Sequence, residues 1–339
     1  MEKIIGYYKN YEKQKYLTTK YHDKYAFVGI GSHSISNLYP VINYLRIPLK
    51  YILVKSAKNA DLISKNFECV IGTNDENQVF NDDEVKNVFI SSNPKSHFKL
   101  VKKALESSKN VFIEKPPCLN LEELKQLIEI EKNSTGFCMV GLQKRHAPVI
   151  QLLKKKKLET LSYNYKFITG AYPEGNPILD LFIHPIDLLV HLFGDYTIMS
   201  VNVSNKDTFF IHLKHDKFIG SIELSTQYSW EQAEEKLVIN TKAGIYDLSN
   251  MEHLTFQKKP GTLFSIPLEK VTKSNPAIET LFSRNNFSPI LENNQLFTSG
   301  YFNEIDVFSK KCTNNKIKNN SSLTDIISTY KLIDHLNSL

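Results

Sequence analysis

The stretch Tyr25-Ala26-Phe27-Val28-Gly29-Ile30-Gly31-Ser32-His33-Ser34 decides the fold. Its apolar residues predict a buried strand that ends in glycine. Gly29 permits a tight turn, and Gly31 lets backbone approach a pyrophosphate. Ser34 stands where a third glycine is usual and begins a predicted helix that runs to Leu45 and offers free N–H groups. This order predicts a dinucleotide-binding loop, whereas an ordinary β–α turn is the alternative.

Short apolar strands alternate with amphipathic helices from Tyr25 to Gly141. Continuous apolar runs between such helices are typical of a parallel sheet covered on both faces. We therefore predict a doubly wound α/β domain, a Rossmann NAD(P)-binding domain, over residues 25–141. Its further strands are predicted at 51–54, 69–71, 88–90, 111–113 and 137–140, and its further helices at 57–64, 95–107 and 121–132.

Strands dominate after Gly141, and several of them alternate between apolar and polar residues. This pattern predicts a C-terminal α/β domain over residues 142–339, with a large, mostly antiparallel sheet backed by helices. We expect it to serve substrate binding and oligomerisation. Its strands are predicted at 161–168, 197–203, 208–213, 218–228, 236–240 and 245–248, and its helices at 147–155, 184–193, 301–311 and 323–336.

Composition excludes several classes of protein. The net charge of +6 over 339 residues is modest, and the run from Lys154 to Lys157 is interpreted as a solvated helix end, so no nucleic-acid partner is expected. Residues 1–24 form a polar, tyrosine-rich N-terminal arm without the apolar core of a signal peptide. No apolar run is long enough to span a bilayer, so we expect a cytoplasmic protein without a membrane partner. Four scattered cysteines without zinc spacing fit a reducing compartment and predict no metal site.

The residues after the second predicted strand select the cofactor. An acidic residue there would bind the ribose 2′-hydroxyl of NAD, but the sequence reads Val54-Lys55-Ser56-Ala57-Lys58, with no acid before Asp61. Lys55, Ser56 and Lys58 can instead neutralise a 2′-phosphate. The sequence therefore favours NADP(H) over NAD(H), unless these lysines are only a solvated strand end.

Several later segments carry a family resemblance. They are Ile90-Ser91-Ser92-Asn93-Pro94-Lys95-Ser96-His97, Val111-Phe112-Ile113-Glu114-Lys115-Pro116, Met139-Val140-Gly141-Leu142-Gln143-Lys144-Arg145, and residues 180–187. In order and spacing, residues 25–200 resemble the glucose–fructose oxidoreductase / inositol dehydrogenase / MocA family. The resemblance implies an NAD(P)-dependent dehydrogenase or reductase that exchanges a hydride between nicotinamide and a carbinol or carbonyl carbon, often of a sugar or cyclitol. It also implies a homodimer or homotetramer.

The resemblance implies that Lys115 and His184 flank the reacting oxygen, with Asp180 four residues before the histidine. Hydride transfer from an alcohol needs a group that removes the hydroxyl proton. Lys115 ends a predicted parallel strand, where such sheets bind ligands. His184 lies near a helix start, which favours a neutral imidazole that Asp180 can orient. The alternatives are an exposed lysine and a buried structural histidine.

The predicted cofactor-binding residues come from five segments of the chain. They are Gly29, Gly31, Ser32, His33, Ser34 and Ile35; Lys55, Ser56 and Lys58; Ser91, Ser92, Asn93, Pro94 and His97 beside the nicotinamide ribose; Glu114 and Lys115; and Gln143 and Arg145.

Two departures from the family pattern keep other readings open. Asn176 and Phe182 stand where glycines are usual, and Phe182 is expected to add bulk beside the substrate. One alternative is a reductase of imines or conjugated double bonds on the same scaffold. Another is an inactive NAD(P)-binding sensor or assembly protein. A metal site built from His184, Asp187 and His191 on one helical face is a further alternative.

Overall fold

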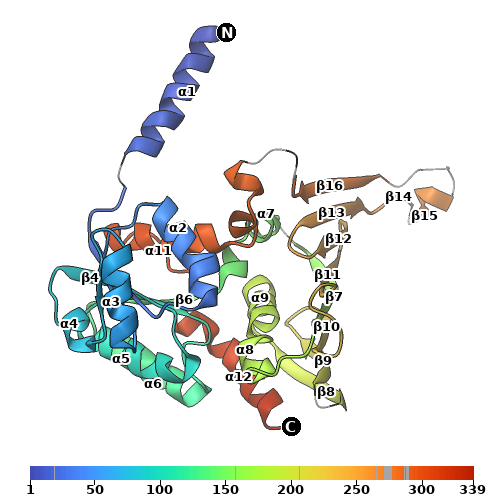
Figure 1. Cartoon of the computed structure of the whole chain (residues 1–339). Helices are drawn as coiled ribbons and strands as arrows, with labels where there is room; N and C mark the ends of the chain where they lie inside the picture. The colour runs from blue at the N-terminus through green and yellow to red at the C-terminus, as the bar shows by residue number, and fades with distance from the viewer. Residues whose placement is uncertain are drawn as a thin grey trace. The chain divides into compact units, whose positions relative to one another are not determined.

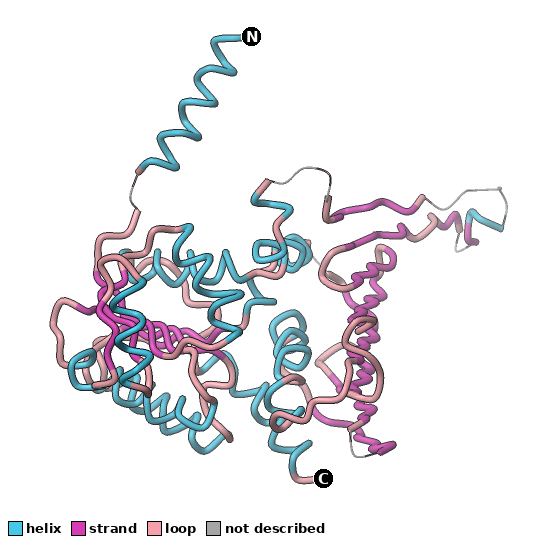
Figure 2. The backbone as a smooth tube through the Cα atoms, viewed as in Figure 1, coloured by secondary structure: helices cyan, strands magenta, loops and turns pink. Residues whose placement is uncertain are grey.

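Two units make up the chain in the computed structural model, which describes residues 1–18, 20–156, 158–205, 207–264, 266–270, 277–285, 287 and 290–339 (Figure 1). The first unit comprises Met1–Gly141 with Ile305–Leu323, and the second comprises Leu142–Glu304 with Thr324–Leu339. Figure 2 shows helices and strands mixed in the first unit and a broad sheet in the second.

Parallel strands form the six-stranded sheet of the first unit, in the order β3-β2-β1-β4-β5-β6. Phe27 of β1 lies opposite Ile52 of β2 on one side and Phe89 of β4 on the other. The strand order reverses between β1 and β4, which is the switch point where such sheets bind ligands. The predicted doubly wound sheet is therefore confirmed. The strands are β1 (Lys24–Val28), β2 (Leu49–Leu53), β3 (Ile71–Thr73), β4 (Val85–Ile90), β5 (Asn110–Glu114) and β6 (Cys138–Gly141).

Amphipathic helices connect these strands. In α5 the buried residues His97, Leu100, Val101, Ala104 and Leu105 recur at helical spacing, so one face packs and the other is solvated. Asn120 caps α6 by accepting the backbone N–H of Glu123. The helices are α1 (Glu2–Leu17), α2 (Tyr39–Tyr44), α3 (Ala57–Asn66), α4 (Glu76–Phe80), η2 (Pro94–Ser96), α5 (His97–Glu106) and α6 (Leu121–Lys132).

The helix predicted from Ser34 begins with a π turn, η1 (Ser34–Leu38). Pro40 explains this turn, because proline has no N–H to donate inside a continuous helix. The wider turn leaves Pro40 in the first turn of α2, where a missing N–H is tolerated.

One helix predicted for the second domain packs in the first unit. Helix α11 (Tyr301–Thr313) places Phe308 against Tyr25, Phe89 and Phe112 from three neighbouring strands. The predicted range 142–339 is thus corrected, since Ile305–Leu323 belong with the first unit. The predicted arm also docks at its end, where buried Tyr21 donates a hydrogen bond to Asp306 at 2.7 Å.

The second unit contains an eight-stranded sheet in the order β16-β13-β12-β11-β7-β10-β9-β8. Strands β7 and β10 pair in parallel, and the other neighbouring pairs are antiparallel, which confirms the mostly antiparallel prediction. The strands are β7 (Thr160–Ile168), β8 (Thr197–Asn205), β9 (Thr208–Lys214), β10 (Ile219–Ser225), β11 (Glu234–Thr241), β12 (Gly244–Ser249), β13 (His253–Lys258) and β16 (Ile278–Ser283), with a small pair β14 (Thr262–Leu263) and β15 (Ile266–Pro267).

The inner face of this sheet is apolar and carries Tyr163, Tyr165 and Leu237, all buried. Side chains on the other face of β7, such as Asn164 and Lys166, are polar. The helical elements of the unit are η3 (Gln143–His146), α7 (Pro148–Lys155), α8 (Pro177–Asp180), α9 (Ile183–Phe193), η4 (Leu268–Lys270), η5 (Leu291–Asn293), α10 (Gln295–Thr298), η6 (Thr324–Ile326) and α12 (Ile327–Asn337).

Some boundaries differ from the prediction. Strand β3 begins at Ile71 rather than Cys69, because Cys69 has φ +61° and turns the chain. The strand predicted to reach Tyr228 ends at Ser225, after which the chain forms a loop. Helix α4 and strands β13 and β16 were not predicted. The last lysine of the run 154–157 lies outside the described residues.

Candidate cofactor and substrate sites

The phosphate loop follows β1 directly. Gly29 has φ +88°, and a Cβ there would lie 2.3 Å from the carbonyl oxygen of Ser91, so only glycine fits. A Cβ on Gly31 would meet nothing within 4 Å, which leaves its backbone open to a ligand. Ser34 is buried, and its hydroxyl donates to Ser91 Oγ at 2.9 Å. In place of a third glycine, Ser34 therefore ties the helix to the loop after β4.

A cavity of about 370 Å³ lies beside this loop, at the carboxyl ends of the strands. Gly29, Lys55 and Ser92 are predicted cofactor-binding residues that line it, whereas Ser56 and Lys58 are not among its lining residues. Ser56 instead caps α3 through the backbone N–H of Asn59. The lining residues are Val28, Gly29, Leu53, Val54, Lys55, Asn74, Glu76, Ser92, Ser96, Lys99 and Leu100.

Four polar lining residues were missed from the sequence: Asn74, Glu76, Ser96 and Lys99. Asn74 and Glu76 follow β3, so the rule that ligands lie at the carboxyl ends of parallel strands could have found them. The Glu76 carboxylate is engaged by Lys103 at 3.1 Å and lies 3.9 Å from Lys99. Because this carboxylate is paired, Lys55 and Lys99 leave the wall of the cavity with a net positive charge.

Glu114 connects the phosphate loop to the predicted catalytic lysine. Its carboxylate is 5% exposed and lies 3.3 Å from Nε2 of His33. Asn37 lies 3.1 Å from the other ring nitrogen of His33. Glu114 Oε1 nevertheless makes no hydrogen bond among the described residues, so the two side chains are close without being bonded. Lys115, half-buried, follows Glu114 and precedes a cis peptide bond to Pro116.

His97 corrects one predicted contact. Its imidazole is 1% exposed, with Nδ1 2.7 Å from the Pro116 carbonyl oxygen and Nε2 3.0 Å from that of Ser92. Burial lowers the pKa of His97. Because both ring nitrogens face backbone carbonyls, His97 joins the loops after β4 and β5 and does not present its ring to a ligand.

Asp180 and His184 lie in the second unit. Asp180 ends α8 and accepts the backbone N–H of Asn176 at 3.1 Å. His184 is half-buried in the first turn of α9, where its position at the amino end matches the sequence prediction. The connection between α8 and α9 is short, so the aspartate and the histidine are carried by one compact segment.

The two departures from the family pattern have local structural roles. Asn176 caps α8 by accepting the N–H groups of Ile178 and Leu179, and its amide donates to Asn337 of α12 at 2.8 Å. Phe182 is 0% exposed and packs edge-on against Phe167 and Phe209 of the sheet. The expectation that Phe182 adds bulk beside a substrate is therefore wrong, because its ring lies in the core.

Arg145 is buried inside the second unit. Its guanidinium donates two hydrogen bonds to Asp187, one from Nε at 2.7 Å, and Thr329 donates to the same carboxylate at 3.1 Å. Burial opposes the charge of Arg145, but Asp187 outweighs it and the pKa of Arg145 is raised. Arg145 is 2% exposed, so the structure assigns it to this internal pair and not to a surface that a cofactor could reach.

The alternative metal site of His184, Asp187 and His191 lacks its aspartate ligand, because the Asp187 carboxylate is paired with Arg145. Across the part of the chain that the structure describes, no group of three or more histidine, cysteine or acidic side chains is arranged to hold a metal ion.

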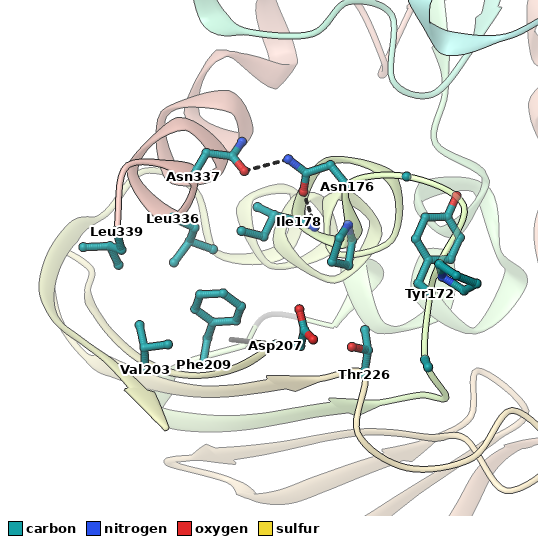
Figure 3. A pocket seen from close by; sticks show the side chains of 14 residues that line it. Tyr172, Asn176, Ile178, Val203, Asp207, Phe209, Thr226, Leu336, Asn337 and Leu339 are labelled. Atoms are coloured by element: carbon teal, nitrogen blue, oxygen red, sulfur yellow. Dashed lines mark hydrogen bonds between the residues drawn. The ribbon is translucent and has the colours of Figure 1, made fainter. Parts of the chain in front are cut away.

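A second cavity, of about 720 Å³, lies wholly within the second unit (Figure 3). The loop that precedes α8 forms one wall, with Tyr172 and Asn176, and Asn337 of α12 bonds to Asn176 there. Asp207 and Thr226 line the cavity near the sheet. Among the described residues, its lining contains neither lysine, arginine nor histidine.

Comparison with known proteins identifies the class of the dinucleotide-binding part of the chain. The fold and loop define an NAD(P)-binding Rossmann domain. Residues 24–142 match the model of an oxidoreductase family with an NAD-binding Rossmann fold, GFO_IDH_MocA. This match confirms, over these residues, the resemblance to the glucose–fructose oxidoreductase / inositol dehydrogenase / MocA family and the oxidoreductase class. No curated protein sequence matches the chain closely enough to count as a relative.

Solved structures share the fold over nearly the whole chain. A dehydrogenase from Chromobacterium violaceum is 19% identical with a TM-score of 0.78, covering 94% of this chain and 95% of that one. Levoglucosan dehydrogenase in complex with NADH and levoglucosan is 15% identical, with a TM-score of 0.76 and coverages of 93% and 96%. A 3-ketoreductase from Actinomadura kijaniata in complex with TDP-benzene and NADP is 12% identical, with a TM-score of 0.71 and coverages of 93% and 97%. At such identities the likeness shows a common fold.

Proposed function

We propose that the protein is an NAD(P)-dependent oxidoreductase that acts on a carbinol or carbonyl carbon of a sugar, sugar derivative or cyclitol. One observation carries the proposal: Glu114, which immediately precedes Lys115, lies 3.3 Å from His33 of the phosphate loop. The end of β5 that carries the predicted proton-transfer lysine is thus close to the loop that would bind the cofactor. Levoglucosan, the ligand named for one of the structures that share the fold, supports sugar chemistry.

The residues around the first cavity fit a dinucleotide. Gly31 leaves its backbone open, and the helix after it presents N–H groups to a pyrophosphate. Ser92 and Gly29 line the same cavity. A bound nicotinamide supplies the chemistry of hydride transfer. The protein contributes binding, orientation and proton movement.

Lys115 and His184 are the proposed proton-transfer groups. Oxidation of an alcohol releases the hydroxyl proton, and reduction of a carbonyl requires one. The neighbours of Lys115 limit where its backbone can lie, since Glu114 lies close to His33 and the Pro116 carbonyl oxygen lies 2.7 Å from Nδ1 of His97. His184 at the start of α9 can accept a proton as a neutral imidazole. Asp180 fixes the segment before it through the N–H of Asn176.

We further propose NADP(H) as the preferred cofactor. Lys55 and Lys99 both line the cavity, and the acid that would bind the 2′-hydroxyl of NAD is replaced by Val54 and Lys55. Lys103 engages the nearby Glu76 at 3.1 Å, which weakens its repulsion of a phosphate.

The catalytic proposal is tested by Lys115→Ala assayed across a panel of sugars and cyclitols with both cofactors. Loss of a proton-transfer group is expected to lower kcat by roughly 10²–10⁴-fold. The matched control is Lys102→Ala, which removes an exposed lysine on α5. Turnover that survives in Lys115→Ala would refute the assignment.

The same assay separates the competing functions. Turnover of cyclic imines or enones, but of no sugar, would favour the reductase alternative. Binding of NADPH without turnover of any substrate would favour a sensor or assembly protein.

The cofactor preference is tested by Lys55→Asp, with Lys65→Asp as the control on the exposed end of α3. Loss of a charge-assisted contact to the 2′-phosphate is expected to weaken NADPH binding by roughly 10–100-fold while NADH binding is kept or improved. Equal effects of both variants on NADPH affinity would remove the basis of the preference.

A cytoplasmic homodimer or homotetramer is part of the proposal. All four cysteines are free thiols, as a reducing compartment predicts. Among the described residues, none of the helices combines the length and hydropathy that a bilayer span requires. Equilibrium sedimentation decides the oligomeric state.

A further inference from the structure

Trp230 is the single tryptophan of the chain and lies in the loop after β10. It is 53% exposed, and its neighbour Tyr228 is 57% exposed. The loop therefore presents two large aromatic side chains at the surface of the second unit.

The indole is fixed by two contacts with the segment that follows β7. Its Nε1 donates to the Ala171 carbonyl oxygen at 2.9 Å. A Cβ on Gly170 would lie 2.4 Å from Trp230 Cδ1, so the ring lies directly against the Gly170 backbone. With its polar atom satisfied, the ring offers only an apolar surface outward.

The loop that carries Trp230 is itself tied down. Thr169 donates its N–H to the Ser225 carbonyl at 2.9 Å, and Tyr228 donates its N–H to the Thr169 carbonyl at 2.9 Å. The Tyr228 hydroxyl donates to Gln232 at 2.9 Å. These bonds continue the pairing of β7 and β10 beyond the strand ends and keep the indole in one orientation.

A polar cavity adjoins the loop that carries Trp230, although the indole itself is not among its lining residues. Its neighbours Tyr228 and Glu231 line a cavity of about 710 Å³ that also contains three carboxamides. Among the described lining residues the one cation, Lys166, is paired with Glu234 at 2.8 Å, which leaves the negative charge of Glu231 in excess. The full lining is Lys166, Ile168, Ser225, Gln227, Tyr228, Glu231, Gln232, Ala233, Glu234 and Asn250.

We propose that Trp230 is a stacking platform for an uncharged sugar or cyclitol ring. Such a ring has an apolar C–H face that matches the indole and hydroxyl groups that match amides and carboxylates. The excess of negative charge disfavours phosphorylated or acidic sugars. Ala171, which accepts the indole N–H, begins the segment that leads to Asp180 and His184, so the platform is anchored to the stretch of chain that carries the proposed proton-transfer histidine. This inference rests on the proposed function and narrows its substrate class.

Because the chain has one tryptophan, its emission reports directly on the proposed platform. The experiment titrates the protein, without cofactor, with myo-inositol, methyl glucoside, phenyl glucoside and glucose 6-phosphate, and records tryptophan emission. We expect saturable quenching or a blue shift with at least one uncharged ring and a much weaker response to the phosphate. No saturable response to any uncharged ring would overturn the proposal.

Substitutions of Trp230 distinguish binding of the sugar ring from the catalytic step. Trp230→Ala is expected to raise KM for the responding ring about tenfold, with kcat and NADPH affinity unchanged, because stacking contributes on the order of 1.4 kcal/mol equally to ground and transition states. Trp230→Phe keeps a flat ring and should recover much of this loss. Gly170→Ala should shift the emission of the free protein and weaken ring binding.

The outcomes distinguish the two proposals. Turnover of an uncharged sugar with an unchanged KM in Trp230→Ala would refute the platform and leave the proposed function standing. Saturable binding to Trp230 without turnover would support the platform and count against the oxidoreductase activity. Emission that changes with protein concentration and not with any sugar would assign Trp230 to a contact between copies of the chain, which also refutes the platform.

Discussion

Replacing Asp187 by asparagine removes one charge from the buried pair with Arg145. Arg145 and Asp187 side chains are each 3% exposed, so the remaining guanidinium has little access to water. Removing one partner of such a pair costs about 3–5 kcal/mol, because an uncompensated charge stays buried. Thr329 also loses a charged acceptor at 3.1 Å. We expect the urea midpoint of the second unit to fall accordingly, with a drop in Tm of roughly 10 °C.

The double variant Arg145→Leu/Asp187→Leu tests the reasoning. Replacing both charges with apolar side chains is often neutral or stabilising, so the midpoint should return towards that of the wild type. Glu159→Gln serves as the control, because its pair with Lys242 is more than half exposed on both sides and should contribute less than about 1 kcal/mol. A loss below about 1 kcal/mol in Asp187→Asn would refute the account of a buried charge.

The double variant also decides what Arg145 does. If Arg145 is structural, as its burial indicates, NADPH affinity stays within about twofold of the wild type when stability is restored. A tenfold loss of affinity in a stable double variant would reinstate the cofactor contact predicted from the sequence.

Three further perturbations have defined outcomes. Burial, with Arg145 adding to it, lowers the pKa of His146 to about 4. The histidine of the unfolded chain takes up a proton at a higher pH than the buried His146 does, so the free energy of unfolding should fall by roughly 3 kcal/mol as the pH drops from about 6.5 to about 4. Urea titrations at several pH values should show a weaker dependence on pH in His146→Gln. Gly29→Ala adds a Cβ 2.3 Å from the Ser91 carbonyl oxygen at φ +88°, and should weaken NADPH binding at least tenfold in a fluorescence titration; unchanged affinity would exclude this turn from the cofactor site. Asn176→Ala removes a helix cap and should cost about 1 kcal/mol of stability, whereas Asn176→Asp should retain most of it.

Periodicity and turn chemistry predicted the sheet of the first unit because these signals are local. Helix α6 was predicted at its observed bounds, since its apolar spacing and its asparagine cap both lie within the segment. The third strand was misplaced by two residues, because the turn at Cys69 uses a positive φ that the apolar run does not reveal. Strands β13 and β16 were missed because their apolar alternation is weak.

The candidate site was predicted in part. Gly29, Lys55 and Lys115 were assigned to one sheet edge because each follows a predicted parallel strand and the carboxyl ends of such strands converge, whereas Ser92 was assigned through the family resemblance. His97 and Arg145 were assigned to the cofactor because the sequence gives their type and position but not their burial. Phe182 was judged by the glycine it replaces, whereas its ring packs against Phe167 and Phe209.

By itself, the sequence determined the two-part α/β architecture and the dinucleotide loop. The hydrophobic periodicity of strands and helices and the glycines of tight turns are local signals, each contained in a few consecutive residues. Only the tertiary structure decided which distant side chains meet: Arg145 with Asp187, Trp230 with Ala171, and Phe308 of α11 with the sheet of the first unit. Such pairs depend on how separate elements pack against one another. No local pattern encodes that packing, so burial and partnership of these residues became known only from the fold.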